Sequence, residues 1–114
     1  MLTEQEMKAI AEHYLTFLER NSSTDIELAL YDNSIKKDYG NIYIYQNKRY
    51  MVTGDEQCLL GGNAPFLVEK ETGRVVSFGT AYPKEHYFEA YENGTLEPTL
   101  TGYWYPEDER YSHE

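Results

Sequence analysis

The sequence predicts an α+β domain, with an N-terminal helix packed on an antiparallel sheet of four to five strands, then a short C-terminal helix and an irregular tail. Two observations predict this class. Apolar residues recur at helical spacing near the two ends of the folded region, and between these ends they fall in short, mostly alternating runs separated by turn residues. No strand–helix–strand alternation is present, which disfavours a doubly wound parallel sheet.

The first helix is predicted from its start signal and its apolar stripe. Thr3 and Glu6 have the spacing of a capping box, in which a hydroxyl and a carboxylate satisfy the first free amides of a helix. Apolar side chains then recur every three to four residues as far as Leu18, and glutamates occupy the opposite side. The polar residues 21–23 end the helix.

Five short segments that follow have the composition of strands. They are residues 25–30, 41–46, 49–53, 66–69 and 74–78. Within the second segment, isoleucines at 42 and 44 alternate with tyrosines at 43 and 45, so the two types face opposite sides. Asn47 and Lys48 are short enough to join this segment to the next as a hairpin. Gly73 supplies the positive φ expected in the hairpin between the last two.

The C-terminal part of the chain is predicted to contain one more helix. Pro83 has the fixed φ that suits a first helical position, and Gly94 closes the helix. Residues 95–114 contain prolines, an aromatic cluster and an acidic run, and are expected to form an arm or tail. The predicted organisation is therefore one α+β domain over residues 1–94 and a C-terminal arm or tail over residues 95–114.

Length and charge restrict the classes of function. The chain has 114 residues, with ten Lys and Arg against twenty Asp and Glu and a net charge of −10, so one domain is expected. Nucleic acids and anionic membranes are disfavoured partners because basic residues supply most of their affinity, whereas a protein with a basic contact surface is favoured. No apolar run approaches the length of a spanning helix, and no signal-peptide pattern is found, so we expect a cytoplasmic protein.

No cluster of residues predicts catalysis, a metal site or a cofactor. Cys58 is the one cysteine, so an internal disulfide is impossible, and no cysteine-enzyme signature surrounds it, although His86 is a conceivable base. His86 and Glu89 have ligand spacing on a helix, but one such pair is common on a glutamate-rich helix. Residues 61–63 lack the Lys-Ser/Thr that a phosphate-binding loop requires. We therefore expect a non-enzymatic protein.

The remaining candidate for function is an aromatic and acidic surface. The chain has twelve tyrosines and one tryptophan, and side chains of these types are enriched at protein interfaces. About half of the tyrosines are expected to be covered by the arm or the short helix instead. The predicted partner-binding residues are Tyr43, Tyr45, Tyr103, Trp104, Tyr105, Glu107 and Asp108. An exposed strand edge could in addition pair two copies into a homodimer.

Four stretches of the sequence resemble the immunity protein 35 (YrhB-like) family. They are residues 42–50, 53–55, 62–73 and 79–83, and the most specific succession is Asn63-x-Pro65 through Thr72-Gly73, followed by residues 79–83, Gly-Thr-Ala-Tyr-Pro. The resemblance covers about half of the chain. It implies a small bacterial cytoplasmic domain that protects the producing cell by binding a polymorphic toxin, such as a papain-like peptidase. It supplies no catalytic residues, and the segment after Gly94 lies outside it.

The leading functional hypothesis is a non-enzymatic immunity protein that binds a cognate bacterial toxin and occludes its active site. The resemblance, the negative charge, the aromatic residues and the lack of a catalytic constellation favour it. The alternative is a housekeeping chaperone-like or ligand-binding domain of the same fold. A cysteine-dependent enzyme that uses Cys58 is the weakest of the three hypotheses.

Overall fold

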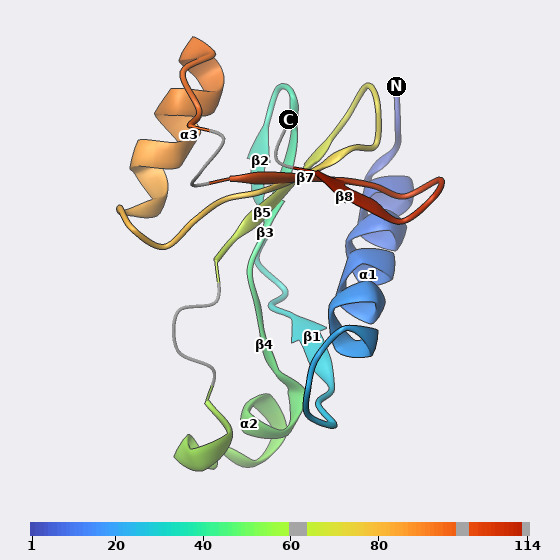
Figure 1. The fold of residues 1–114 in the computed structure, drawn as a ribbon, viewed down its shortest axis with the longest axis vertical. Helices are drawn as coiled ribbons and strands as arrows, with labels where there is room; N and C mark the ends of the chain where they lie inside the picture. The colour runs from blue at the N-terminus through green and yellow to red at the C-terminus, as the bar shows by residue number, and fades with distance from the viewer. Residues whose placement is uncertain (60–63, 98–100, 113–114) are drawn as a thin grey trace.

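The predicted α+β class is confirmed by a computed structural model, which describes residues 1–59, 64–97 and 101–112 (Figure 1). The helices are α1 (Glu4–Arg20), α2 (Lys48–Thr53), the 3₁₀ helix η1 (Glu56–Cys58) and α3 (Lys84–Asn93). The strands are β1 (Leu28–Leu30), β2 (Ile35–Lys37), β3 (Gly40–Tyr43), β4 (Tyr45–Asn47), β5 (Phe66–Glu69), β6 (Val75–Ser77), β7 (Gly102–Tyr105) and β8 (Arg110–Ser112). Residues 54–64, which the glycines at 54, 61 and 62 predict to be a loop, contain η1, and residues 60–63 of this segment lie outside the described residues.

The strands form two antiparallel sheets. The larger has six strands in the order β2-β3-β5-β6-β7-β8, and the smaller pairs β1 with β4. Figure 1 shows α1 and α3 on opposite sides of the six-stranded sheet, with α2 at the far end of the molecule. The sheet therefore has two faces, which we call the α1 face and the α3 face after the helix that covers each.

Each face of the large sheet has its own apolar core. Because side chains alternate along a strand, Phe66 and Val68 of β5 contact the α1 core while Leu67 between them contacts the α3 core. Met7, Ala11, Tyr14 and Leu15 of α1 complete the first core, and Tyr87 and Phe88 of α3 complete the second. The fully apolar run of β5 is thus explained by burial on both faces.

The capping box at the start of α1 is confirmed. The Thr3 hydroxyl accepts a hydrogen bond from the Glu6 amide at 3.1 Å, and the Glu6 carboxylate accepts one from the Thr3 amide at 2.9 Å. The helix ends at Arg20, where the polar residues were expected to stop it. Of the helices in the described ranges, none is both long and apolar enough to span a bilayer.

Two predictions for the middle of the chain are wrong. Residues 49–53, expected to be a strand, lie in α2, because the Asn47 side chain caps the Arg49 amide at 2.8 Å and Gly54 ends the helix at a φ of 73°. The expected strand over residues 41–46 is divided at Ile44 into β3 and β4, which belong to different sheets. Tyr43 and Tyr45 nevertheless both pack toward the α1 core, as their spacing predicts.

The segment expected to be an irregular tail differs most from the prediction. Residues 102–112 form β7 and β8, and β7 pairs with β6 so that Val75 lies opposite Trp104. This pairing joins residues far apart in the sequence, and Trp104 is fully buried, so a local sequence pattern displays neither feature. The large sheet therefore has six strands instead of four to five, and three of them, β2, β7 and β8, were not predicted as strands.

Gly40 is required where β2 turns into β3. Its φ is 155°, and a Cβ atom added there would lie 2.1 Å from the Val68 carbonyl oxygen of the adjacent strand. That oxygen belongs to the backbone of a central strand, so it cannot move without disturbing the β3–β5 ladder. Only glycine fits this close approach.

Gly40→Ala is expected to lower the free energy of unfolding by about 3 kcal/mol or more, because it combines a backbone clash with an unfavourable φ. Gly54→Ala is the matched control, since its φ is also positive at 73° but a Cβ there meets nothing within 4 Å. Its loss should be about 1 kcal/mol. Urea denaturation of both variants measures the difference, and equal losses would show that the close approach to Val68 carries no cost.

Candidate partner-binding surface

The predicted partner-binding residues are divided between the two faces of the large sheet. Along β7, Trp104 points to the α1 core, while Tyr103 packs beside the α3 core. Tyr105 follows Tyr103 at a spacing of two and therefore shares its face. The three aromatic residues that are contiguous in the sequence are thus divided between the two faces of the sheet, because successive side chains of β7 point to opposite sides.

Three of the seven predicted residues belong to the α1 core or pack against it. Trp104 has 0% of its surface exposed and Tyr43 has 5%, so their side chains are not accessible to a partner in this structure. Tyr45 is half-buried and packs against Phe66, with ring centroids 6.0 Å apart. These three aromatic rings stabilise the fold instead of forming a surface.

The other four predicted residues come together around two arginines. The guanidinium of Arg74 lies 4.3 Å from the ring centroid of Tyr103, and that of Arg110 lies 4.1 Å from the ring centroid of Tyr105. Arg110 also pairs with Asp108 at 3.5 Å, and Glu107 lines a shallow depression with Arg74 and Tyr105. We call this set the tyrosine face: Arg74, Tyr103, Tyr105, Glu107, Asp108 and Arg110.

The arginines of the tyrosine face could not be identified from local sequence. Arg74 immediately precedes β6, and its place beside β7 follows from the pairing of Val75 with Trp104 across these two strands. Arg110 lies directly opposite Tyr105 in the β7–β8 ladder. An available signal was the spacing of Tyr105 and Arg110 around Pro106, which is compatible with a hairpin loop of four residues.

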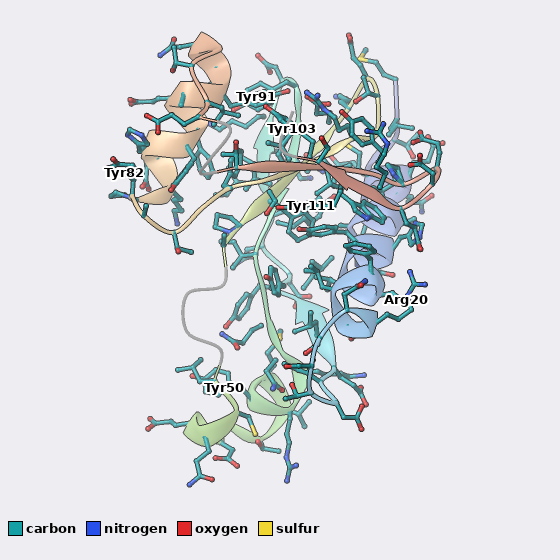
Figure 2. All side chains as sticks on the ribbon, viewed as in Figure 1. Arg20, Tyr50, Tyr82, Tyr91, Tyr103 and Tyr111 are labelled. Carbon is teal, nitrogen blue, oxygen red and sulfur yellow. The ribbon has the colours of Figure 1, made fainter. Side chains whose placement is uncertain are left out.

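Arg74 is held in place by Glu69, a buried carboxylate at the end of β5. Arg74 donates two hydrogen bonds to it at 2.8 and 2.9 Å, Thr72 donates one at 2.8 Å, and Tyr91 of α3 donates one at 2.6 Å. Burial alone would raise the pKa of Glu69, but hydrogen bonds from Arg74, Tyr91 and Thr72 outweigh it and hold the pKa below its usual value. The carboxylate thus links the tyrosine face to α3, and Figure 2 shows Tyr91 and Tyr103 at the same end of the molecule.

The turn that carries Glu107 and Asp108 is held by a separate ion-pair cluster. Glu109 in this turn has a positive φ of 52° and accepts hydrogen bonds from Arg20 at 2.5 Å and His13 at 2.7 Å, both on α1. These two hydrogen bonds lower the pKa of Glu109. The ion pairs therefore tie the β7–β8 turn to the C-terminal half of α1.

The residues weighed for catalysis are not brought together. Cys58 lies in η1 next to α2, and its thiol donates to Asp55 at 3.8 Å, whereas His86 lies on α3 and its ring contacts that of Tyr82. Figure 1 shows α2 and α3 at opposite ends of the molecule. Across residues 1–59, 64–97 and 101–112, no three His, Cys, Asp or Glu side chains gather in a way that could hold a metal ion.

Glu69→Gln is expected to lower the free energy of unfolding at pH 7 by about 1–3 kcal/mol, because it removes a charge that accepts four hydrogen bonds. Since folding lowers the pKa of Glu69, its contribution is fully present above the unfolded pKa of about 4.3–4.5 and disappears as the pH falls through the folded value. In denaturant titrations, the difference in free energy of unfolding between wild type and variant should therefore shrink as the pH falls below the unfolded pKa of about 4.3–4.5.

The control for that measurement is Glu71→Gln, an exposed neighbour in the same turn. It should change stability by less than about 0.5 kcal/mol at every pH. A Glu69→Gln deficit that is the same at pH 7 and pH 3 would show that charge is not what this network requires.

An uncharacterized protein of Escherichia coli (strain K12), YrhB, is 33% identical over 92 residues, which cover 81% of this chain and 90% of that protein. No family model and no solved structure matches the chain. An identity of this level over most of both chains establishes common descent, and the chain therefore belongs to the YrhB family.

Proposed function

We propose that this chain is a non-enzymatic, cytoplasmic immunity protein that binds a cognate bacterial toxin through the tyrosine face and occludes the toxin's active site. The observation that carries the proposal is the pairing of each tyrosine of this face with an arginine, Tyr103 with Arg74 and Tyr105 with Arg110. Tyrosine and arginine, together with tryptophan, are enriched among the residues that dominate binding energy. The toxin class to test first is a papain-like peptidase, which the family resemblance suggests.

Preorganisation supports the use of this face for tight binding. Ordering a flexible side chain at an interface costs about 0.5–1.5 kcal/mol, and a long arginine is among the costlier ones. Arg74 is already fixed by two hydrogen bonds to Glu69, and Tyr103 is fixed under its guanidinium. Much of this cost is therefore met during folding, and more of the contact energy remains for the partner.

The net charge supports a basic contact surface on the toxin. The chain carries −10 overall, and Glu107 and Asp108 lie exposed at the rim of the tyrosine face. Such a field accelerates encounter with a basic partner, and the association rate should fall as salt screens it. Inhibition by occlusion requires an association that outlasts the toxin's catalytic cycle, and the burial of tyrosines and arginines slows dissociation.

A chaperone-like function is the second candidate, and one observation favours it. Val52 in α2 has 76% of its surface exposed, and Met51 and Leu59 nearby have 38% and 46%. Exposed apolar side chains at one end of a molecule can contact unfolded chains. Val52→Asp should abolish suppression of heat-induced aggregation of a model client protein if this second function holds, and equal suppression by the variant and the wild type would contradict it.

Tyr105→Ala is expected to weaken binding of the toxin encoded beside the gene by at least tenfold, which corresponds to about 1.4 kcal/mol. Tyr103→Ala should do the same, because both rings belong to one surface. Tyr82→Ala is the matched control, since Tyr82 is an exposed tyrosine at the start of α3, away from β7 and β8 (Figure 2). Isothermal titration with purified toxin measures all three, and circular dichroism confirms that each variant is folded.

Protection of cells provides the second readout. Cells that co-express the toxin should survive with the wild-type chain and with Tyr82→Ala, and should lose viability with Tyr105→Ala. A neighbouring gene product that neither binds the chain nor kills cells would contradict the proposed function. Toxin binding that is unchanged in Tyr103→Ala and Tyr105→Ala would contradict the assignment of the tyrosine face.

A further inference from the structure

A groove on the α1 face has the construction of a site for an extended peptide. It has a volume of about 540 Å³ and lies between α1 and the segment that begins with β1. Leu28 and Leu30 of β1 contribute apolar walls on one side of the groove, and Leu15 of α1 lines the other. The groove is thus bounded by a helix along one side and a strand along the other.

Among the described residues, no second strand pairs with β1 on the side of this groove. The strand belongs to a two-stranded sheet, in which it pairs with β4 alone. Tyr31 donates its amide to Ile44 of the partner segment, and Glu27 accepts from Lys48, so the odd-numbered residues 27, 29 and 31 face β4. The backbone groups of Leu28 and Leu30 consequently point the other way, toward α1.

One of these outward groups already has an acceptor from across the groove. The Leu28 amide donates to a carboxylate oxygen of Glu19, in the last turn of α1, at 2.6 Å. That oxygen occupies the place where the carbonyl oxygen of an added strand would accept the same hydrogen bond. The edge of β1 is therefore geometrically able to bind an acceptor that approaches from the groove.

The charge of the groove indicates which peptide would fit. Its lining includes the carboxylates of Glu4, Glu12, Glu19 and Asp32 and the ammonium groups of Lys8 and Lys48. Lys48 is already paired with Glu27 at 3.8 Å, and Glu4 with Lys36 at 3.5 Å, so the charges left over are those of Glu12, Glu19 and Asp32 against Lys8. A strand that alternates basic and apolar side chains would place one set against these carboxylates and the other against the leucines.

We propose that the α1–β1 groove binds an extended, lysine- or arginine-bearing segment of a protein partner, which adds as a strand to the outer edge of β1 and replaces the Glu19 carboxylate at the Leu28 amide. The inference rests on the proposed function in one respect only, which is the identity of the protein that supplies the segment. The groove lies on the α1 face and the tyrosine face on the α3 face, so the two sites can be tested separately.

The experiment uses the intact chain, labelled with nitrogen-15, and three amidated octapeptides. The first has four Lys-Val repeats and the second has four Glu-Val repeats. The third is the Lys-Val peptide with alternate backbone nitrogens methylated, so that one edge of the peptide cannot donate backbone hydrogen bonds. The Lys-Val peptide should bind with a millimolar or better dissociation constant and shift the amide signals of Leu28 and Leu30. The Glu-Val and methylated peptides should bind at least about fivefold more weakly.

Charge variants identify the groove. The double variant Glu12→Gln, Asp32→Asn should reduce affinity for the Lys-Val peptide by about fivefold, as expected for two exposed ion pairs. Its matched control is Glu71→Gln, Glu89→Gln, which makes the same charge change at exposed residues outside the groove and should leave affinity unchanged. The Tyr105→Ala variant should also bind the peptide as the wild type does.

The two proposals then fail in different ways. Unshifted signals for Leu28 and Leu30 at saturating peptide, or equal affinity for the Lys-Val and Glu-Val peptides, would overturn the groove site. Neither outcome would affect toxin binding through the tyrosine face. Loss of toxin binding in Tyr105→Ala with unchanged peptide binding is expected if both proposals hold.

Discussion

The burial of Trp104 under α1 is the constraint on which the surfaces of this protein depend. Its indole packs against His13, Tyr14 and Phe17 at centroid distances of 4.9, 5.3 and 5.4 Å, and none of its surface is exposed. Its ring nitrogen lacks a hydrogen-bond partner among the described residues, which costs about 1–3 kcal/mol. The apolar contacts of the ring must exceed this cost, because burying so large a side chain contributes several kcal/mol.

That burial fixes the register of β7. Side chains alternate with a period of two, so an inward Trp104 requires Tyr103 and Tyr105 to face the opposite side, and a shift of one residue would exchange them. Gly102 reinforces the same register, because a Cβ there would lie 2.1 Å from the Tyr111 hydroxyl, whose ring crosses this position. The tyrosine face therefore exists because one neighbouring aromatic residue is taken into the core.

Local signals in the sequence predicted the elements that local interactions stabilise. The capping box of Thr3 and the glycine after α3 act within a few residues, so α1 and α3 begin and end near their predicted positions. The prediction of a strand at residues 49–53 was wrong because the caps at Asn47 and Gly54 stabilise a helix there, and they outweigh the preference of the β-branched residues for a strand. The arginines of the tyrosine face were not predicted, for two reasons. Arg74 comes beside β7 only through the pairing of β6 with β7, which are far apart in the sequence. Arg110 comes opposite Tyr105 through the β7–β8 hairpin, which the sequence around Pro106 did not predict.

The two proposed sites lie on opposite faces because the sheet between them is buried on both sides. Val68 and Leu67 are consecutive, fully buried residues of β5, one in each core, so a rigid apolar layer separates the groove from the tyrosine face. α1 bounds the groove through Glu19 and holds the β7–β8 turn through Arg20, the next residue along the same helix. Displacement of Glu19 by a bound strand would thus act beside the contact that positions Glu107 and Asp108, and α1 is the element through which the two sites would influence each other.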